Sequence, residues 1–578
     1  ERKKMKLKFI AAILAAMPVI WAGDSFTVPA HPKFIKTGWC DPTVSFFAAN
    51  VKMIEKALPH RGVGINPDIV KDENGKSILP NYTMFTRKKM KKEYFAEQIR
   101  LLQNTKSKKL TDNFLKTGFL DAEKKFDLYD DAFWDGVCHN FNVLASVAKE
   151  GGLKGIILDM EDYWRLQNWK YRPEKGRTFR EDYAKARQRG REFISAICKG
   201  YENINILAYF WLELDPAMSQ HTPELLEKKL MISHTGLLSG FINGIYDKIS
   251  PTARIHDGME DHCYKANEGQ ISYNRFRAIR ANRYKRLIDP VNHAKLRAQT
   301  LFAPAIFIDA FIQPSGIYAL KREDLTPLEY FRANAVVAAE FSDCYVWTFS
   351  SSRKWYEIPY KKWAEKSLKK YPAFGGPYWE NALPGIYDAI TYAQNPYLTA
   401  VEWANKGKIA KNNIAVNGDF SQVRKSKNKD TAPGVTSLKD VPGWSYWFPK
   451  DSKNASFQYS KDGGRNNSGC IKAVNLAKGT LIQNIKLKKG KTYLIRASIK
   501  GEGNPVMSVQ WRNAKNAWCS HMENLRTSFD EKLTDNWKRA TQFIFAPPAE
   551  ASYFSVLISP AGKVPGECYI DDVEIFEI

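Results

Sequence analysis

The stretch GIILDMEDYW, residues 155–164, joins a short apolar run to three acidic and two aromatic residues. Its apolar part is typical of a strand in a parallel sheet, because such strands are buried on both faces. The acids Asp159, Glu161 and Asp162 follow at the point where that strand would end. A buried strand followed by polar side chains recurs along the chain, and this recurrence decides the fold prediction.

Strand-like and helical segments alternate eight times between about residues 30 and 400. The strand-like segments are FIKTGWCDP (34–42), RGVGINPDI (61–69), KLTDNFLKTGF (109–119), KGIILDMEDYW (154–164), NINILAYFWLEL (203–214), ARIHDGMEDHCY (253–264), LFAPAIFIDAFIQP (301–314) and DCYVWTFSSSRKWY (343–356). Strands alternating with helices predict parallel βαβ units, and eight such units predict an α/β fold of the (β/α)8 TIM barrel type. An open, doubly wound sheet is the alternative, but no glycine-rich phosphate loop follows the first strand.

The sequence changes in character after about residue 405, where helical periodicity ends and short alternating strands separated by Gly, Pro and Asn turns begin. This pattern predicts an all-β jelly-roll sandwich. We therefore predict three segments: a signal peptide at 1–22, a catalytic barrel at 23–405 and a β-sandwich at 406–578.

The first residues combine a basic segment, ERKKMKLK, with an apolar one, FIAAILAAMPVIWA. This order predicts a secretory signal peptide, so the mature protein is expected to be secreted or periplasmic. The apolar run is too short to span a bilayer comfortably, and no membrane anchor is expected. The eight cysteines form neither a CxxC pair nor a Cys/His cluster with zinc spacing, so no zinc site is predicted.

Five segments after residue 405 share the order and spacing of one family of modules. They are NNIAVNGDFS (412–421), VPGWSYW (441–447), LIQNIKLKKGKTYLIRASIKG (481–501), NWKRATQFIFAPP (536–548) and CYIDDVEIFEI (568–578). Together they resemble the carbohydrate-binding modules of the family 4, 9 and 22 type. Modules of this kind also occur as purely structural appendages.

The resemblance implies two kinds of site. Sugar-stacking candidates are Trp444, Tyr446, Trp447, Trp511 and Trp518, and the alternative for each is a core or edge aromatic. The family often holds a structural Ca²⁺ between its first and last strands, and Asp572 matches the acidic position there. Ser421 stands where many members carry Glu.

Polar residues gather at the predicted carboxyl ends of the barrel strands, where catalytic residues of such barrels lie. They include Asp68, Asp215, Gln313 and Ser350, and the ones we predict to bind substrate are Trp39, Asp41, Asn66, Glu213, His256, Asp309, Trp347 and Arg353. An acid at a strand end also serves as a helix cap or a loop ion pair. The number of polar groups gathered at one end nevertheless favours a site.

Asp159 and Glu161 stand two residues apart, so on one strand their side chains point to the same face. A second carboxylate nearby raises the pKa of the weaker acid, as a general acid requires near neutral pH. Glycosidic cleavage needs two carboxyl groups, or one carboxyl and a substrate group that acts as the nucleophile. We predict Glu161 as the acid/base and Asp159 as its modulator. The second group is Glu260, Asp257 or Asp309, with the first two preferred, and no cofactor is expected for catalysis.

GIILDMEDYW also resembles the strand-4 signature of the chitinase-like family 18 glycoside hydrolases, D-x-x-D-x-D-x-E. Asp159 and Glu161 match its last two acids, whereas Lys154 and Ile157 stand at the first two positions. The resemblance implies a substrate-assisted mechanism, in which a 2-acetamido group attacks and Asp159 orients it. The barrel as a whole resembles glycoside hydrolase barrels secreted by bacteria that digest polysaccharides.

The leading prediction is a secreted, endo-acting glycoside hydrolase with a polysaccharide substrate. The formal net charge of +25 favours an anionic partner, and the predicted export counts against nucleic acid. We expect a sulfated or uronate-containing polysaccharide, with Lys36, Arg254 and Arg353 facing it. The alternatives are a non-catalytic glycan-binding protein and a polysaccharide lyase with His256 or Tyr264 as its base. The sugar, the linkage, the stereochemistry and the oligomeric state stay open.

Overall fold

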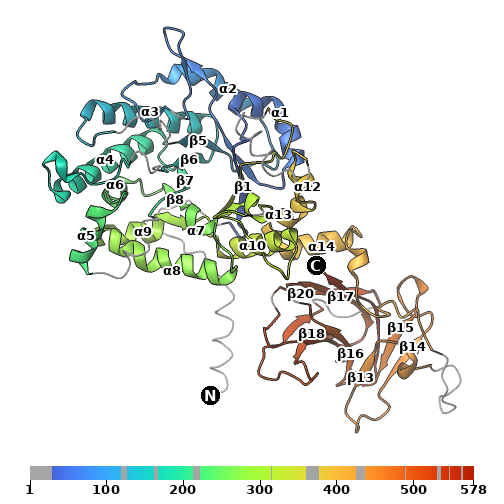
Figure 1. The fold of residues 1–578 in the computed structure, drawn as a ribbon. Coiled ribbons are helices and arrows are strands. Elements are labelled where there is room, and N and C mark those ends of the chain that lie inside the picture. Colours follow the sequence, from blue (N-terminus) through green and yellow to red (C-terminus); the bar gives the residue numbers. More distant parts are fainter. Residues whose placement is uncertain are drawn as a thin grey trace. The chain divides into compact units, whose positions relative to one another are not determined.

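The computed structural model describes residues 29–81, 83–118, 126–161, 167–212, 222–313, 315–359, 376–424, 436–488, 490–529, 535–545, 547–561 and 564–578 (Figure 1). Contacts divide the chain into unit 1, Glu1–Gln394, and unit 2, Asn395–Ile578. The predicted signal peptide lies outside the described residues. Within them, no helix is both long enough and apolar enough to cross a membrane.

The main sheet of unit 1 is parallel throughout the residues described there. Its strand order is β10 (Ala305–Phe307), β11 (Tyr345–Ser350), β1 (Lys33–Gly38), β2 (Gly62–Ile65), β5 (Phe114–Gly118), β6 (Gly155–Asp159), β7 (Asn205–Ala208), β8 (Arg254–Asp257) and β9 (Thr300–Phe302). A hairpin of β3 (Val70–Lys71) and β4 (Ser77–Ile78) follows β2. Each of the eight predicted strand segments contains a strand of the main sheet.

The two edge strands of this sheet, β9 and β10, are consecutive pieces of chain separated only by Ala303 and Pro304. β9 pairs with β8, and β10 pairs with β11, so one chain segment belongs to both ends of the sheet. The strands otherwise follow one another in sequence order, without the reversal that a doubly wound sheet requires. The sheet is therefore compatible with the predicted (β/α)8 barrel.

Helices surround the strands of unit 1 (Figure 1). They are α1 (Val44–Ala57), α2 (Ala96–Asn104), α3 (Asp131–Glu150), α4 (Phe179–Gly200), α5 (Pro223–Ile232), α6 (Leu238–Lys248), α7 (Glu260–Cys263), α8 (Gln270–Leu287), α9 (His293–Gln299), α10 (Pro327–Phe341), α12 (Trp379–Ala382) and α13 (Ile386–Gln394). Local sequence explains where several begin: α4 and α10 each start with a Thr and Glu capping box, at Thr178 and Thr326.

Unit 2 contains two antiparallel sheets that enclose one apolar core. One sheet is β12 (Thr436–Ser437), β14 (Ser456–Ser460), β15 (Cys470–Val474), β22 (Glu567–Glu577), β17 (Tyr493–Gly501) and β20 (Lys538–Ile544). The other is β13 (Ser445–Trp447), β16 (Thr480–Lys486), β21 (Tyr553–Ser559), β18 (Val506–Arg512) and β19 (Leu525–Ser528). Antiparallel sheets are therefore confirmed for the C-terminal segment that was predicted to be all-β, residues 406–578.

A helix, α14 (Pro396–Asn405), belongs to unit 2, although residues up to 405 were predicted within the barrel. Its last residue accepts a hydrogen bond from Arg496 of β17, a buried residue on the face of the sheet opposite the core, with 2.6 Å between Arg496 Nη1 and Asn405 Oδ1. This contact ties the helix to the sandwich.

Candidate active site

The carboxyl end of β6 places two acids beside each other. β6 ends at Asp159, and the Asp159 carboxylate accepts a hydrogen bond from the backbone N–H of Glu161, with 3.1 Å between Glu161 N and Asp159 Oδ1. Both residues are half-buried. The expected strand alternation does not extend to Glu161, because the chain has left the strand. The two residues are adjacent through a side chain to backbone contact instead.

The carboxyl end of β8 contributes a third acid. The chain turns sharply through Gly258 and Met259, and Met259 has a φ of +42°, which is rare for a residue with a side chain. This turn lets the Glu260 N–H donate to the carbonyl of Tyr209, which follows β7, over 3.2 Å. Strained backbone of this kind is concentrated at functional sites. Glu260 is half-buried and begins the short helix α7.

Aromatic rings fill the space between these strand ends. Tyr209 stacks on Trp347 of β11, with ring centroids 4.2 Å apart and an angle of 10° between the rings. Tyr264 lies against Trp347 and against Phe307 of β10, at centroid distances of 5.9 Å and 5.1 Å. The Tyr264 hydroxyl and the Trp347 Nε1–H are buried and have no hydrogen-bond partner in the described structure.

Electrostatics link the acids to these rings. Burial raises the pKa of Tyr264 well above its usual value, and the charges of Glu260, Asp159 and Glu161 raise it further. Burial also raises the pKa of Tyr318, again with contributions from Glu260 and Glu161. Acids from β6 and from the β8–α7 turn therefore act on the same two hydroxyls, and both tyrosines stay protonated.

A buried charge network lies beside the acids. Lys36 Nζ donates to Asp41 Oδ1 over 2.8 Å, and Lys116 Nζ donates to Asp41 Oδ2 over 3.2 Å. Burial opposes the charge of Lys116, but Tyr209, Asp41 and Asp159 outweigh it, so the pKa of Lys116 is raised. Burial raises the pKa of Asp159, while the Glu161 N–H and the Lys116 charge oppose this.

A cavity of about 1210 Å³ opens at this end of unit 1, beside β6, β7 and β8. Glu161 lines it, together with Trp211 and Tyr318. Asp261 also lines it and is paired with Lys265 over 2.9 Å. This space is large enough for several sugar units, since ligand pockets for small molecules are about 300–1,000 Å³.

Several predicted substrate-binding residues hydrogen-bond to neighbouring groups at this end of the sheet instead of lining the cavity. The Asn66 amide donates to the Asp41 carbonyl over 3.1 Å. Asp309 accepts from the Ser351 N–H over 2.9 Å and from the Ser352 hydroxyl, and Arg353 Nη1 donates to that hydroxyl over 2.9 Å.

Trp39, another predicted substrate-binding residue, also lies within this frame. Trp39 is half-buried, and its N–H donates to the Ser350 carbonyl over 2.9 Å. Glu213, like Asp162 and Asp215, lies outside the described residues.

The predicted β8 residues separate into different environments. His256 points toward the amino ends of the strands, where its Nε2 lies 2.8 Å from Asn205 Oδ1 and its ring 4.7 Å from that of Tyr345. Burial and the nearby Arg254 lower the pKa of His256 to about 3. Asp257 is fully buried and paired with Arg280 over 3.2 Å. Neither residue is brought to the cavity.

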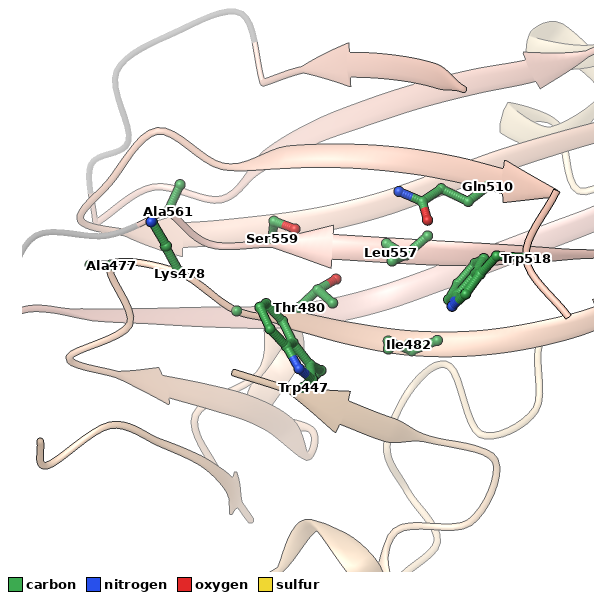
Figure 2. Close-up of a pocket in the computed structure, with 11 residues that line it drawn as sticks. Trp447, Ala477, Lys478, Thr480, Ile482, Gln510, Trp518, Leu557, Ser559 and Ala561 are labelled. Atoms are coloured by element: carbon green, nitrogen blue, oxygen red, sulfur yellow. The ribbon is translucent and has the colours of Figure 1, made fainter. Parts of the chain in front are cut away.

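A second concave site of about 630 Å³ lies on the β13–β16–β21–β18 sheet of unit 2 (Figure 2). Trp447 and Trp518 line it and are 57% and 45% exposed, which is unusual for tryptophan. Figure 2 shows the two rings on either side of Ile482 in this view. Trp444 and Trp511 belong to the core, where their indole N–H groups donate to the carbonyls of Asn417 and Glu523.

The groups around Asp572 do not form a suitable set of ligands for the Ca²⁺ that the resemblance implies. Asp572 Oδ2 lies 2.6 Å from Arg465 Nη1, so a guanidinium already occupies the cation position. The neighbouring Asp571 carboxylate accepts from the Arg465 N–H and the Ser468 hydroxyl over 2.7 and 2.8 Å. Ca²⁺ takes six to eight oxygen ligands. No cluster of three or more His, Cys, Asp or Glu that suits a metal occurs in the described residues.

Residues that sequence reasoning missed are Lys116, Tyr209 and Tyr318. Lys116 stands within a strand expected to be apolar, and a lysine at such a position is the sequence signal that could have revealed it. The two tyrosines carry no comparable signal, because aromatic residues are frequent along the whole chain.

No family model matches the chain, and no curated protein matches it. Three solved structures show weak similarity. An arabinose-bound family 51 α-L-arabinofuranosidase has 10% identity, TM-score 0.20 and coverage of 28% of this chain and 27% of that one. The CBM22-1–GH10 modules of a Clostridium thermocellum endo-1,4-β-D-xylanase, complexed with xylohexaose, have 14% identity, TM-score 0.19 and coverage of 24% and 26%.

A family 4 carbohydrate-binding module has 18% identity, TM-score 0.20 and coverage of 28% of this chain and 99% of that one. The chain thus spans about a quarter of the length of the first two proteins. At TM-scores of 0.19–0.20 these likenesses carry no argument about fold or function.

Proposed function

We propose that unit 1 is the (β/α)8 barrel of a secreted glycoside hydrolase that cleaves a polysaccharide. One observation carries the proposal: Glu161 follows the end of β6, is hydrogen-bonded through its N–H to Asp159, and lines a large cavity at this end of the sheet. Catalytic residues of such barrels come from the ends of several different strands. The basic and then apolar residues at 1–22 support export.

In the proposed reaction Glu161 protonates the leaving glycosidic oxygen as the glycosidic bond breaks. The partner carboxylate either attacks the anomeric carbon, forming a glycosyl ester that water activated by Glu161 then hydrolyses, or itself activates the water that attacks that carbon. Glu161 suits this role because it lines the cavity and is held next to Asp159. Glu260 is the preferred partner, because it follows β8 at the same end of the sheet, where its N–H donates to the carbonyl of Tyr209. Asp257 is a weaker choice, since Arg280 already neutralises it. A substrate-assisted reaction, with Asp159 orienting a 2-acetamido group, is the second form of the mechanism.

Unit 2 is proposed to hold the glycan through Trp447 and Trp518. Flat aromatic rings stack on the apolar faces of sugars, and both rings are exposed over one groove. Replacing both by Ala is expected to abolish retention of a glycan in affinity electrophoresis without lowering the Tm. A double variant that still binds as tightly as the wild type contradicts this role.

A lyase is less well supported. A lyase base has to lose its proton, but burial and three nearby acids keep the Tyr264 hydroxyl protonated. His256 faces the opposite end of the strands. Tyr264 is better suited to donate a hydrogen bond to the substrate or to a carboxylate.

A screen of neutral and anionic polysaccharides with the full chain tests the function. The hydrolase predicts new reducing ends without ultraviolet-absorbing unsaturated products. Unsaturated products indicate a lyase, and binding without any cleavage indicates a glycan-binding protein. Either result contradicts the proposed hydrolase.

A further inference from the structure

Three basic side chains from three different elements line the cavity of unit 1. Lys170 follows β6, Lys229 lies in the last turn of α5, and Arg275 lies in α8. They are more than 45 residues apart from one another in sequence, and the fold brings them to one space. We call these three residues the cationic wall.

The cationic wall differs from the other basic groups near the site because it lacks protein partners. Lys36 and Lys116 are paired with Asp41, and Lys265 is paired with Asp261. Lys170, Lys229 and Arg275 make no ion pair or side-chain hydrogen bond with any described residue.

Partial burial makes this lack of partners costly. Lys170 and Lys229 are both half-buried. A charge that is partly removed from water is destabilising unless an opposite charge compensates it. Arg275 lines the same cavity but is exposed. Two half-buried cations without an opposite charge, with a third cation on the same cavity, therefore indicate that an anionic ligand completes the site.

The other charged residues that line the cavity do not neutralise the cationic wall. Asp261 is neutralised by Lys265 and also accepts a hydrogen bond from Tyr318 over 3.2 Å. Glu268 is exposed, and Glu161 is the proposed catalytic acid. His234 and His262 also line the cavity, and burial lowers the pKa of His262, so it adds little positive charge.

We propose that the cationic wall recognises an anionic group on the glycan, a sulfate ester or a uronate carboxylate, and thereby sets substrate specificity. The proposal deepens the proposed function and rests on it. The cationic wall takes the role that was predicted for Lys36, Arg254 and Arg353. Those three are engaged elsewhere: Lys36 is paired with Asp41, Arg254 Nη1 donates to two backbone carbonyls, and Arg353 is buried. A guanidinium suits both groups, since it binds sulfate and carboxylate oxygens bidentately.

The test uses the full chain with Trp447 and Trp518 replaced by Ala, so that unit 2 does not contribute to binding. The probes are κ-carrageenan and its desulfated form, and polygalacturonate and its methyl ester. These two pairs distinguish sulfate from carboxylate. Affinity electrophoresis at low and at physiological salt measures binding, and reducing ends are recorded from the same samples.

The triple substitution Lys170→Met, Lys229→Met and Arg275→Met is expected to weaken binding of the preferred charged probe at least about tenfold. Binding of the uncharged partner should stay within about twofold, and the salt dependence should flatten. The control carries Lys228→Met and Arg286→Met, exposed cations of α5 and α8 that do not line the cavity, and should match the parent.

Equal binding of charged and uncharged probes by the parent overturns the inference, and so does unchanged binding by the triple variant. Release of reducing ends is a separate readout. Its absence from every probe counts against hydrolysis of these glycans, whereas the binding result alone decides the role of the cationic wall.

Discussion

Tyr264 has a buried hydroxyl without a hydrogen-bond partner among the described residues, and the charges of Glu260, Asp159 and Glu161 raise its pKa. A buried polar group without a hydrogen bond costs stability, and we expect a bound substrate to supply the partner of this hydroxyl. The Trp347 Nε1–H is in the same condition nearby. The Tyr264 hydroxyl and the Trp347 Nε1–H are therefore two buried donors without an acceptor among the described residues at this end of the sheet.

Tyr264→Phe removes the hydroxyl and keeps the ring contacts. We expect kcat/KM to fall about tenfold, while the free energy of unfolding stays the same or rises, because no hydrogen bond in the free protein is lost. Kinetics on the identified glycan and urea unfolding measure the two effects. A variant that is destabilised by more than about 1 kcal/mol and keeps its kcat/KM would show a structural role instead.

Whether the sequence alone could reveal a site residue depends on what that residue contacts. Asp159, Glu161 and Glu260 are acids directly after buried strands, so their position was predictable. Their mutual geometry was not, because the end of β6 at Asp159 depends on tertiary contacts. The sequence prediction placed His256 at the site because it stands near the end of β8. β8 has only 4 residues, however, and the His256 side chain contacts Asn205 at the amino end of β7.

At the scale of elements, α4 and α6 pack at very close range. Gly190 of α4 and Gly244 of α6 allow it, since a Cβ added at either would lie 1.9 Å from a backbone oxygen of the other helix. Beside this contact Arg187 binds Asp247 with two hydrogen bonds of 2.8 Å. Arg191 of α4 adds a third contact to Asp247, at 3.1 Å.

Asp247→Asn tests this ion pair. Burial raises the pKa of Asp247, but hydrogen bonds from Arg187 and Asn292 outweigh this and lower it to about 2, from the usual 3.8. A lowered pKa stabilises the fold above the unfolded value, and this stabilisation disappears as pH falls from about 4 to about 2. Urea unfolding should therefore show a loss of about 2 kcal/mol at pH 7 that shrinks toward pH 3.

The matched control is Glu97→Gln, whose pair with Arg100 lies on the surface of α2, with side chains 63% and 60% exposed. Its effect should be small at every pH, because solvent screens a surface ion pair. A pH-independent difference for Asp247→Asn would assign the effect to packing instead of charge.

A second element-scale prediction concerns the hairpin after β18. The Arg512 guanidinium carbon lies 3.6 Å from the centroid of the Trp518 ring, and Ser555 Oγ and the Asn516 carbonyl fix the guanidinium, each over 2.8 Å. Arg512→Met should weaken glycan binding by unit 2 about fivefold, because the ring loses its support.

Lys500→Met removes a similar contact, at 4.9 Å from the Trp537 ring, outside the groove. It should leave binding unchanged. Binding by Arg512→Met that equals the wild type would show that Trp518 is positioned without Arg512.

Strand periodicity predicted the elements of unit 1 well, because buried parallel strands and amphipathic helices carry strong local patterns. The division of one strand into β9 and β10 at Pro304 was not predicted, although proline lacks the N–H that a central strand donates. The extent of unit 2 was also missed, because α14 has an ordinary helical pattern and only its contact with β17 assigns it.

At the scale of the whole chain, the net charge of +25 does not mean a uniformly free basic surface. In the run RKKMKK, residues 87–92, every basic residue is paired with an acid elsewhere in unit 1: Asp130, Asp72, Asp135, Glu73 and Glu150. Surface pairs of this kind contribute little stability individually. They do remove that run as a candidate for binding anions, in contrast to the cationic wall.

The stability of the chain should not depend on calcium. Arg465 already neutralises Asp572, so a divalent ion at this position would meet a guanidinium. Thermal unfolding of the full chain is expected to give the same Tm in EDTA and in millimolar CaCl₂, whereas Arg465→Ala lowers it. A Tm that rises with Ca²⁺ in the wild type would contradict this assignment.

The central claim is that Glu161 transfers the proton in glycosidic cleavage. Its most direct test is the release of reducing ends from the polysaccharide identified in the screen, by wild type, Glu161→Gln and the control Glu268→Gln, which alters an exposed glutamate lining the same cavity. The account predicts that kcat falls by about 10²–10⁴ in Glu161→Gln, with binding retained, and that Glu268→Gln stays near wild type. Cleavage by Glu161→Gln at the wild-type rate would contradict it.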